Sequence, residues 1–437
     1  MSILAVLVAL LPPLLHSEIV LPGRPSQVHL AYGDSDRSLK VMWTTFAPTA
    51  NSTLRLCPSG EPCQDHPGSM RLFLFDEDAG EDPIPRYLHE VALENLKAGL
   101  EYAYTVGSGI DAIWSQAFSF TGPKVSYTSA VFTNSTNFLA FGDFGTCSNM
   151  STATLAALTA EAHTHDYDFY ILPGDIAYDL YMLNGVRGDW FMRDIEGFAA
   201  FVPFMVVVGN HEYFYNFTHY KTLFDMPQDT DNFYYSYNVG PVHVIVFTTE
   251  ALCSSPYCPI LQQRQMEWLQ ADLQAANTRR HLQPWILAFS HKPLYCSVDW
   301  NRQVLYDDCV LDAIERRVIY EDMFAYYMVD VHFAGHTHNY ERHAPVYQER
   351  VAPSEVETPH LYVNPSSPIH IVTGAAGSCR PEDDDMDPVS STPSPYSLYR
   401  SAELSYSRVQ ANATVLKVQQ VASVSGDVLD YFYIVKT

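Results

Sequence analysis

The sequence predicts a mixed α/β protein in which a β-sandwich precedes a layered α/β domain. Residues 24–125 hold short runs with alternating, β-branched or aromatic residues. From Asn137 onward, apolar runs of strand length alternate with helical stretches. The 437 residues are 47% hydrophobic and only 17% charged, which favours packed domains over disorder.

The first block has the features of an all-β domain. Its strand-like runs are separated at short intervals by clusters of Gly, Pro, Asn and Asp, which is typical of a sandwich. The runs are Gln27–Leu30, Lys40–Thr45, Met70–Phe75 and Glu101–Val106. Nothing in this block looks like a reaction centre.

The second block predicts a sheet covered on both sides. Its expected strands begin at Phe138, Asp168, Phe204, Val242, Trp285 and Val329, and its clearest helices are 151–162 and 262–277. We expect surface loops over 349–367 and 380–396. The second loop contains the acidic run Glu382–Asp387, which we interpret as a solvated loop, with Ca²⁺ binding as the alternative.

The charge balance restricts the partners. Lys and Arg total 25 against 50 Asp and Glu, for a formal charge of −25. A nucleic-acid partner requires a basic surface, so this balance argues against one.

The first 17 residues predict a signal peptide. Ile3–Leu15 is mostly apolar and too short to span a bilayer. No Lys or Arg lies near Met1, and the alternative is a buried N-terminal strand or helix. No later stretch reaches 18 apolar residues, so we expect no membrane anchor.

Two further features favour export. Five acceptor sequences for N-linked glycans occur, at Asn51, Asn134, Asn149, Asn216 and Asn412. The eight cysteines form no zinc-type Cys-x-x-Cys pattern, and local bridges Cys57–Cys63, Cys253–Cys258 and Cys296–Cys309 are plausible by spacing. We therefore expect a secreted, extracellular or lysosomal glycoprotein of undetermined oligomeric state.

Potential metal ligands follow five of the expected strands. The blocks are Gly142-Asp143, Gly174-Asp175-Ile-Ala-Tyr178-Asp179, Gly209-Asn210-His211-Glu212, Ser290-His291 and Gly335-His336-Thr-His338. In α/β sheets, binding residues collect in loops beyond the carboxyl ends of strands. Five such ends, with oxygen and nitrogen donors, predict a metal site.

These blocks, in this order, resemble the metallophosphoesterase superfamily and, within it, the purple acid phosphatases. Gly145 stands where many relatives have His, whereas Tyr178 has the spacing from Asp175 that purple acid phosphatases use for a phenolate ligand. Gln27–Leu30, Trp43 and Tyr102-Ala-Tyr104 look like the family's fibronectin-type N-terminal domain, and Tyr406–Lys436 looks like its closing β-hairpins. The chain is similar to the larger plant-type enzymes and to the iron/zinc purple acid phosphatase-like proteins of animals.

The resemblance implies a fibronectin-type domain over 24–125, a calcineurin-like catalytic domain over 135–375 and a C-terminal segment over 376–437. It also implies two metal sites that share Asp175. Asp143, Tyr178 and His338 would hold Fe³⁺, and Asn210, His291 and His336 would hold Zn²⁺, Fe²⁺ or Mn²⁺. Anionic oxygen donors on a hard trivalent ion and neutral donors on a divalent one agree with general ligand preferences.

The implied activity is that of an acid phosphatase, with a metal-bound hydroxide attacking small phosphate monoesters. His211 is the candidate to bind a phosphate oxygen or protonate the leaving group. The chain lacks the further His that plant-type enzymes have about ten residues after the position of His291, which leaves the leaving-group acid undecided, with Asp299 as a substitute. Glu341 and Arg342 are expected to form a buried ion pair.

Two other functions remain open. The same site could cleave phosphodiesters or nucleotide pyrophosphates, or the chain could be a secreted binding glycoprotein with weakened catalysis.

Overall fold

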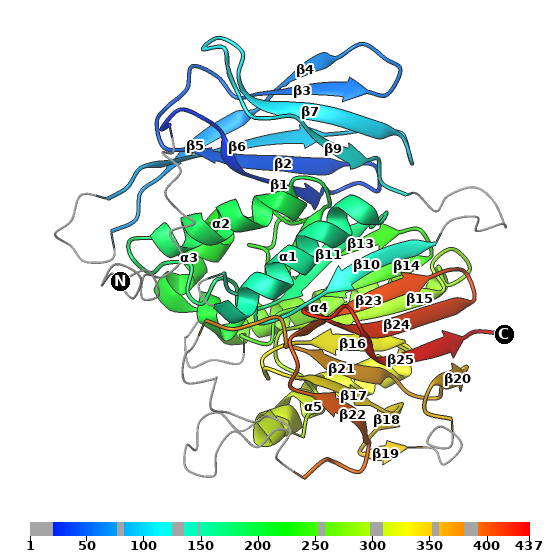
Figure 1. Ribbon diagram of the computed structural model, residues 1–437. Coiled ribbons are helices and arrows are strands. Elements are labelled where there is room, and N and C mark those ends of the chain that lie inside the picture. Colours follow the sequence, from blue (N-terminus) through cyan, green and yellow to red (C-terminus); the bar gives the residue numbers. More distant parts are fainter. Residues whose placement is uncertain are drawn as a thin grey trace, which may run out of the picture.

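The computed structural model describes residues 21–76, 83–124, 135–146, 149–251, 258–297, 309–351, 358–379 and 392–437. Figure 1 shows a β-sandwich, in blue and cyan, above a larger α/β domain. The predicted signal peptide, the acidic run Glu382–Asp387 and Asp299 lie outside the described residues, as do Cys147 and Cys253.

The N-terminal sandwich consists of two antiparallel sheets. One has the order β1 (Ser26–Tyr32), β2 (Leu39–Thr45), β6 (Arg86–Leu93) and β5 (Ser69–Phe73). The other has the order β4 (Gln64–Pro67), β3 (Thr53–Pro58), β7 (Glu101–Ser108) and β8 (Ile113–Trp114), with β9 (Phe118–Thr121) also paired to β7. In β7 the buried residues alternate with more exposed ones, which is the pattern expected of a strand with one face on the core. The β-sandwich prediction is confirmed.

Buried polar contacts join the sandwich to the α/β domain. The Arg86 guanidinium lies 2.7 Å from the carboxylate of Asp189, which is in α2 (Val186–Ala199). Gln27 donates to the same carboxylate at 3.1 Å. A charge pair with both partners buried requires this close geometry, because an unpaired charge there would be costly. These contacts fix the sandwich on α2.

Within the described residues, two seven-stranded sheets form the centre of the α/β domain. The first has the order β12 (Phe204–Val207), β11 (Phe169–Pro173), β10 (Thr136–Ala140), β23 (Ser405–Ala411), β24 (Val415–Ala422), β25 (Val428–Val435) and β20 (Leu361–Val363). The second has the order β13 (Tyr235–Val239), β14 (Val242–Val246), β15 (Trp285–Phe289), β16 (Val331–Ala334), β21 (Ile369–Thr373), β17 (Tyr340–His343) and β22 (Ser397–Ser401). Strands β10 to β12 run parallel, as do β14, β15, β16 and β21.

The two sheets pack face to face, which corrects the expected single sheet covered on both sides. Phe138 of the first sheet contacts Phe289 and Phe333 of the second, with ring centroids 6.0 and 6.3 Å apart. The opposite face of the second sheet, which includes Ile286, packs against helices α4 (Cys258–Thr278) and α5 (Cys309–Tyr326). Both faces of the second sheet are therefore apolar. From the sequence one can infer that these faces are buried, but not whether a helix or another sheet covers each of them.

The remaining elements lie around this core. Helix α1 (Asn149–Thr164) contacts the first sheet through Leu158, whose carbonyl oxygen accepts from the Tyr170 hydroxyl at 3.1 Å. The helices predicted over 151–162 and 262–277 correspond to α1 and α4. The expected loop 349–367 contains the short strands β19 (Arg350–Val351), paired with β18 (Val346–Tyr347), and β20. No helix in the described part of the chain has the length and apolar character needed to cross a bilayer.

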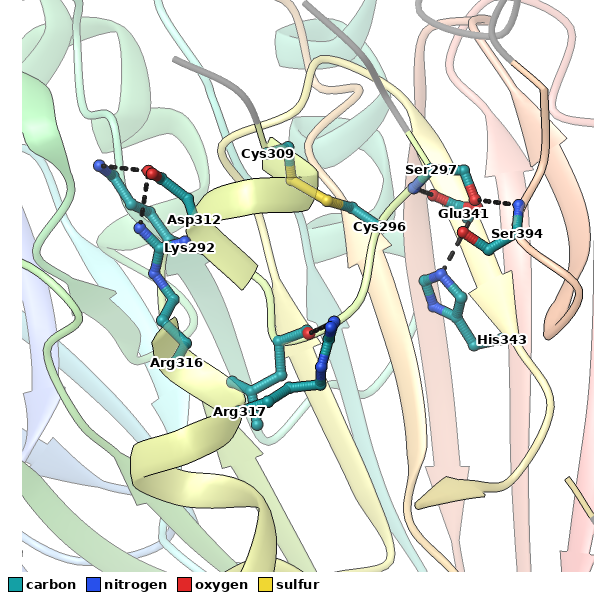
Figure 2. The surroundings of a disulfide bond; sticks show 11 residues. Lys292, Cys296, Ser297, Cys309, Asp312, Arg316, Arg317, Glu341, His343 and Ser394 are labelled. Carbon is teal, nitrogen blue, oxygen red and sulfur yellow. Dashed lines mark hydrogen bonds and ion pairs between the residues drawn. A yellow bond between two sulfur atoms is a disulfide. The ribbon is translucent and has the colours of Figure 1, made fainter. Parts of the chain in front are cut away.

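Two predicted disulfides are present, Cys57–Cys63 and Cys296–Cys309. The second joins the segment after His291 to the start of α5 (Figure 2). Cys258 is also disulfide-bonded, and its predicted partner Cys253 lies outside the described residues.

The expected ion pair between Glu341 and Arg342 is wrong. Both lie in β17, where successive side chains point to opposite faces of the sheet. Glu341 accepts from the Ser297 backbone N–H at 2.9 Å (Figure 2). Arg342 instead binds the Asp430 carboxylate through two contacts of 2.6 and 2.9 Å.

Candidate metal centre

Oxygen donors reach the site from the first sheet. Asp143 follows β10, Asp175 and Tyr178 follow β11, and Asn210 lies in a short 3₁₀ turn after β12. Asp143, Asp175 and Tyr178 all have positive φ, of 60°, 57° and 47°. Non-Gly residues rarely adopt a positive φ. Such residues are found at functional sites, where contacts with the surrounding structure stabilise the strained backbone. Here the positive φ turns the chain sharply at the ends of two parallel strands.

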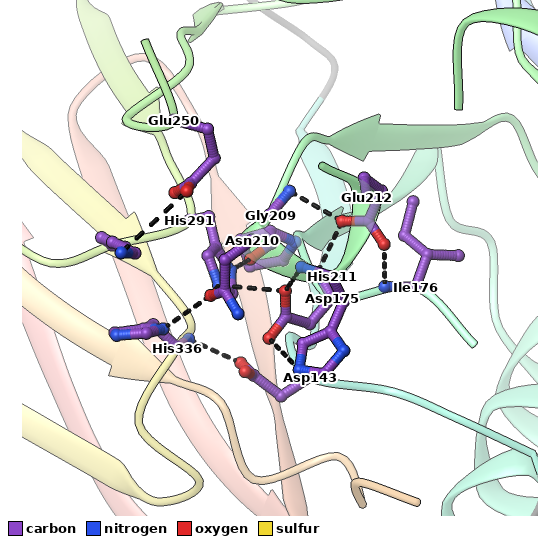
Figure 3. Close-up of polar contacts among 12 residues, drawn as sticks. Asp143, Asp175, Ile176, Gly209, Asn210, His211, Glu212, Glu250, His291 and His336 are labelled. Atoms are coloured by element: carbon purple, nitrogen blue, oxygen red, sulfur yellow. Dashed lines mark hydrogen bonds and ion pairs between the residues drawn. The ribbon is translucent and has the colours of Figure 1, made fainter. Parts of the chain in front are cut away.

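Nitrogen donors reach the site from the second sheet. His291 follows β15, and His336 and His338 follow β16. His291 Nδ1 lies 2.9 Å from the carbonyl oxygen of Pro173, so this nitrogen carries the hydrogen and Nε2 is turned toward the site. One end of the two packed sheets therefore brings carboxylates, a phenol and an amide from the first sheet against three imidazoles from the second. Figure 3 shows Asp143, Asp175 and Asn210 facing His291 and His336.

The side chains form two groups that have one residue in common. Asp175, His291 and His336 place possible ligand atoms within 4.8 Å of one another, and so do Asp143, Asp175 and His338. Asn210 Oδ1 joins the first group, at 2.9 Å from His291 Nε2 and 3.0 Å from His336 Nδ1.

Tyr178 joins the second group. Its hydroxyl lies 2.9 Å from His338 Nε2 and 3.5 Å from Asp143 Oδ1. The structure thus brings together all seven residues that the sequence analysis selected, in the same two groups. Their chemistry fits a pair of cations, because lone pairs on oxygen and nitrogen converge at two adjacent points.

The charges of these groups depend on one another. Burial raises the pKa of Asp143 above its usual range. Burial would do the same for Asp175, but the nearby His291 and His211 hold its pKa well below the usual range. Burial favours the neutral form of His291, yet the Asp175 carboxylate raises the pKa of His291 to about 10. The proton on His291 therefore compensates the negative charge of the Asp175 carboxylate. A bound cation would compensate the same charge.

His211 lies beside this centre rather than in either group. Its Nδ1 is 2.7 Å from Asp179 Oδ1, and its Nε2 is 3.8 Å from Asp175 Oδ2. Asp179 thereby fixes the orientation of the imidazole, and Nε2 is turned toward the metal ligands. The sequence analysis did not assign a role to Asp179, although it stands in the same block as Tyr178.

Glu212 is a second residue without a predicted role. Its carboxylate accepts from the backbone N–H groups of Asp175 at 3.1 Å, Ile176 at 2.8 Å and Gly209 at 2.7 Å (Figure 3). Burial and the neighbouring Asp175 raise the pKa of Glu212 to about 8. Glu212 therefore ties the turn that carries Asn210 to the loop that carries Asp175.

Three successive parts of the chain match family models, two of purple acid phosphatases and one of calcineurin-like phosphoesterases. The purple acid phosphatase N-terminal domain matches residues 25–122, the calcineurin-like phosphoesterase family matches 136–340, and the iron/zinc purple acid phosphatase-like protein C family matches 367–431. Acid phosphatase type 7 of Danio rerio is 37% identical, covering 96% of this chain and 93% of that protein. The chain belongs to the purple acid phosphatase family.

More distant members resemble this purple acid phosphatase too. The Fe(3+)-Zn(2+) purple acid phosphatase 12 of Arabidopsis thaliana is 27% identical, over 82% of this chain and 73% of that protein. The solved structure of purple acid phosphatase PPD1 from yellow lupin superimposes with a TM-score of 0.78 at 23% identity, covering 95% of this chain and 75% of the lupin chain. The last comparison shows that the fold is shared.

Proposed function

We propose that this protein is an acid phosphatase that hydrolyses small phosphate monoesters at a pair of metal ions, one Fe³⁺ and one divalent. The observation that carries the proposal is that Asp175 belongs to both ligand groups, since one carboxylate can bridge two adjacent cations. The family name, which specifies iron and zinc, supports the choice of metals. Fe²⁺ and Mn²⁺ are the other candidates for the divalent position.

Each group suits a different ion. Asp143, Tyr178 and His338 would hold Fe³⁺, because a phenolate forms only beside a strongly Lewis-acidic ion. Asn210, His291 and His336 would hold the divalent ion through neutral donors. When bound, the two ions would polarise phosphate oxygens and lower the pKa of water for attack on phosphorus.

His211 is the proton-transfer group in this proposal. With Nδ1 held by Asp179, Nε2 is available to bind a phosphate oxygen or to protonate the departing alcohol. Asp299, the other candidate acid, lies outside the described residues. On the contact between His211 and Asp179 we assign the catalytic role to His211 and a positioning role to Asp179.

Export of the protein, to the extracellular space or to the lysosome, is part of the same proposal. The disulfides Cys57–Cys63 and Cys296–Cys309 support it, because such bonds persist in oxidising compartments.

The test combines elemental analysis with spectroscopy on protein purified from a eukaryotic host. We expect two metal equivalents, one of them iron, and a visible absorption band from the Tyr178 phenolate that Tyr178→Phe removes. Phosphatase activity should exceed activity on a diester of the same alcohol. A single ion per chain, or a band that survives Tyr178→Phe, would contradict the assignment, and a faster diester reaction would contradict the substrate class.

A further inference from the structure

Three consecutive aromatic side chains directly follow the turn that carries Asn210 and His211. Tyr213, Phe214 and Tyr215 are 45%, 48% and 45% exposed, and we call them the aromatic ledge. They form one wall of a cavity of about 730 Å³. Contiguous exposed apolar surface on a folded protein usually marks a site where something else binds.

The ledge is held rigidly by the protein beneath it. Phe214 packs on Tyr181 with ring centroids 4.7 Å apart, and Tyr215 packs on Phe75 at 4.8 Å. Each of these two rings therefore contacts the protein beneath it while about half of its side chain stays exposed. The ledge is a preformed surface, and little side-chain freedom remains to be lost when a ligand covers it.

The backbone after the ledge presents an asparagine to the same cavity. Tyr215, Asn216 and Phe217 have φ values of 53°, 57° and 60°, which form a left-handed turn. Phe217 is buried and contacts Phe233 at a centroid distance of 5.0 Å, which anchors the turn. Asn216 is exposed and lines the cavity.

Asn216 is also the acceptor of the sequence Asn216-Phe217-Thr218. A sugar joined to its amide nitrogen would start inside the aromatic-walled cavity. Sugar rings have C–H faces that pack on aromatic rings, and hydroxyl edges that need polar partners. Thr230, Lys221 and Arg264 supply polar groups to the same cavity.

We propose that Asn216 carries an N-linked glycan whose first sugars lie in this cavity against the aromatic ledge. The occupant is specified because its attachment point is part of the cavity wall. The inference rests on the proposed export of the protein, since glycan addition occurs on that route. In this proposal the glycan on Asn216 covers the exposed rings of the aromatic ledge.

Two other acceptors, Asn412 and Asn51, have different surroundings. Asn412 is exposed in the turn between β23 and β24, and its Oδ1 accepts from the Thr414 and Val415 backbone N–H groups at 3.0 and 2.8 Å. The Asn51 amide donates to Thr53 at 2.6 Å and accepts from Ser108 at 2.7 Å. A glycan on Asn412 would project from an exposed turn at the end of two strands, which makes that residue the matched control.

The experiment measures enzymatic release of each glycan from the folded, secreted full-length protein, followed by mass spectrometry of the Asn216 and Asn412 peptides. We expect the Asn216 glycan to be released at least ~10-fold more slowly than the Asn412 glycan, and at a similar rate after denaturation, because only packed groups are protected in the native state. Phe214→Ser should accelerate release at Asn216 and leave release at Asn412 unchanged.

Two variants separate this result from a folding defect. Thr218→Ala should abolish modification of Asn216, whereas Thr218→Ser should keep it, and phosphatase activity reports that the variants have folded. A glycan on Asn412 with none on Asn216 would refute this inference alone. Equal native release rates at the two sites would also refute it. No glycan at either site of the secreted protein would also refute this inference, without bearing on the proposed export or on phosphatase activity.

Discussion

At the scale of single residues, Asp175 has the largest expected effect, because it belongs to both ligand groups. We predict that Asp175→Asn lowers the content of both metals together and reduces phosphatase activity by at least ~100-fold. Metal analysis of the purified variant beside the wild type checks this. Asp272→Asn, which alters an Asp–His pair elsewhere in the domain, is the control. Two retained metal equivalents in Asp175→Asn would rule out the shared ligand.

His211 should affect turnover rather than metal content. We predict that His211→Ala lowers kcat by about 10²–10⁴-fold while both ions remain bound, because proton transfer contributes that much. Asp179→Asn should give a smaller loss in kcat and shift its pH profile, since Asp179 acts through the imidazole. If Asp179→Asn changed only stability, the positioning role would be refuted.

Asp143, Asp175 and the ligand histidines could be selected from the sequence because they follow strands of recognisable composition. Tyr178 and the division into two groups came from the resemblance to purple acid phosphatases. The contact between His211 and Asp179 could not be predicted from the sequence, because the two residues are 32 positions apart and lie in two different loops. The same holds for Glu212, whose three backbone partners lie in two different loops.

At the scale of the elements, the site depends on how closely the loop after β12 approaches the loop after β11. A Cβ atom added at Gly209 would lie 2.3 Å from Asp175 Oδ1. We predict that Gly209→Ala displaces the Asp175 carboxylate and lowers the content of both metals, with activity reduced at least ~10-fold. Gly197→Ala in α2 is the control, because a Cβ there has only ordinary contacts of 3.4 Å. Full metal content in Gly209→Ala would show that the loop adapts.

The six named strands of the α/β domain and helices α1 and α4 were predictable because their apolar patterns are bounded by Gly or polar residues, whereas α2 and α5 were not predicted. The arrangement of the strands into two sheets was not predicted either. Every residue of β14 and β15 is buried, and a continuous apolar run does not distinguish a covering helix from a second sheet.

At the scale of the whole molecule, the boundary between the sandwich and the α/β domain contains a pH-dependent pair. Burial and Asp225 raise the pKa of Glu90 to about 7, against the opposing effects of Lys40 and Arg71. Its unfolded value is 4.5, so between about pH 4.5 and 7 the folded protein retains a proton that the unfolded chain has lost. This contribution to stability is complete below pH 4.5 and is lost as pH rises through about 7.

We therefore predict that Glu90→Gln flattens the dependence of unfolding free energy on pH over this range and is more stable than the wild type above pH 7. Denaturant unfolding at several pH values measures this. Glu101→Gln, which makes the same charge change at an exposed position, should leave the wild-type dependence intact. A Glu90→Gln profile parallel to that of the wild type would contradict the prediction.

The relation between the two domains could not be predicted either. Arg86 and Asp189 are 103 positions apart, and each reads as an ordinary surface charge in the sequence. Their pairing appears only once the sandwich lies on α2.

The position of β23 has a consequence for biosynthesis. This strand pairs with β10, so the strand that leads to Asp143 has a neighbour that is synthesised only after every proposed metal ligand. The sandwich can fold early, because all its strands precede residue 125. The α/β domain must wait with β10 unpaired on one side, which exposes a sheet edge to aggregation. A chain cut short after β22 would therefore be retained by chaperones as an incomplete protein, even though it contains every proposed metal ligand.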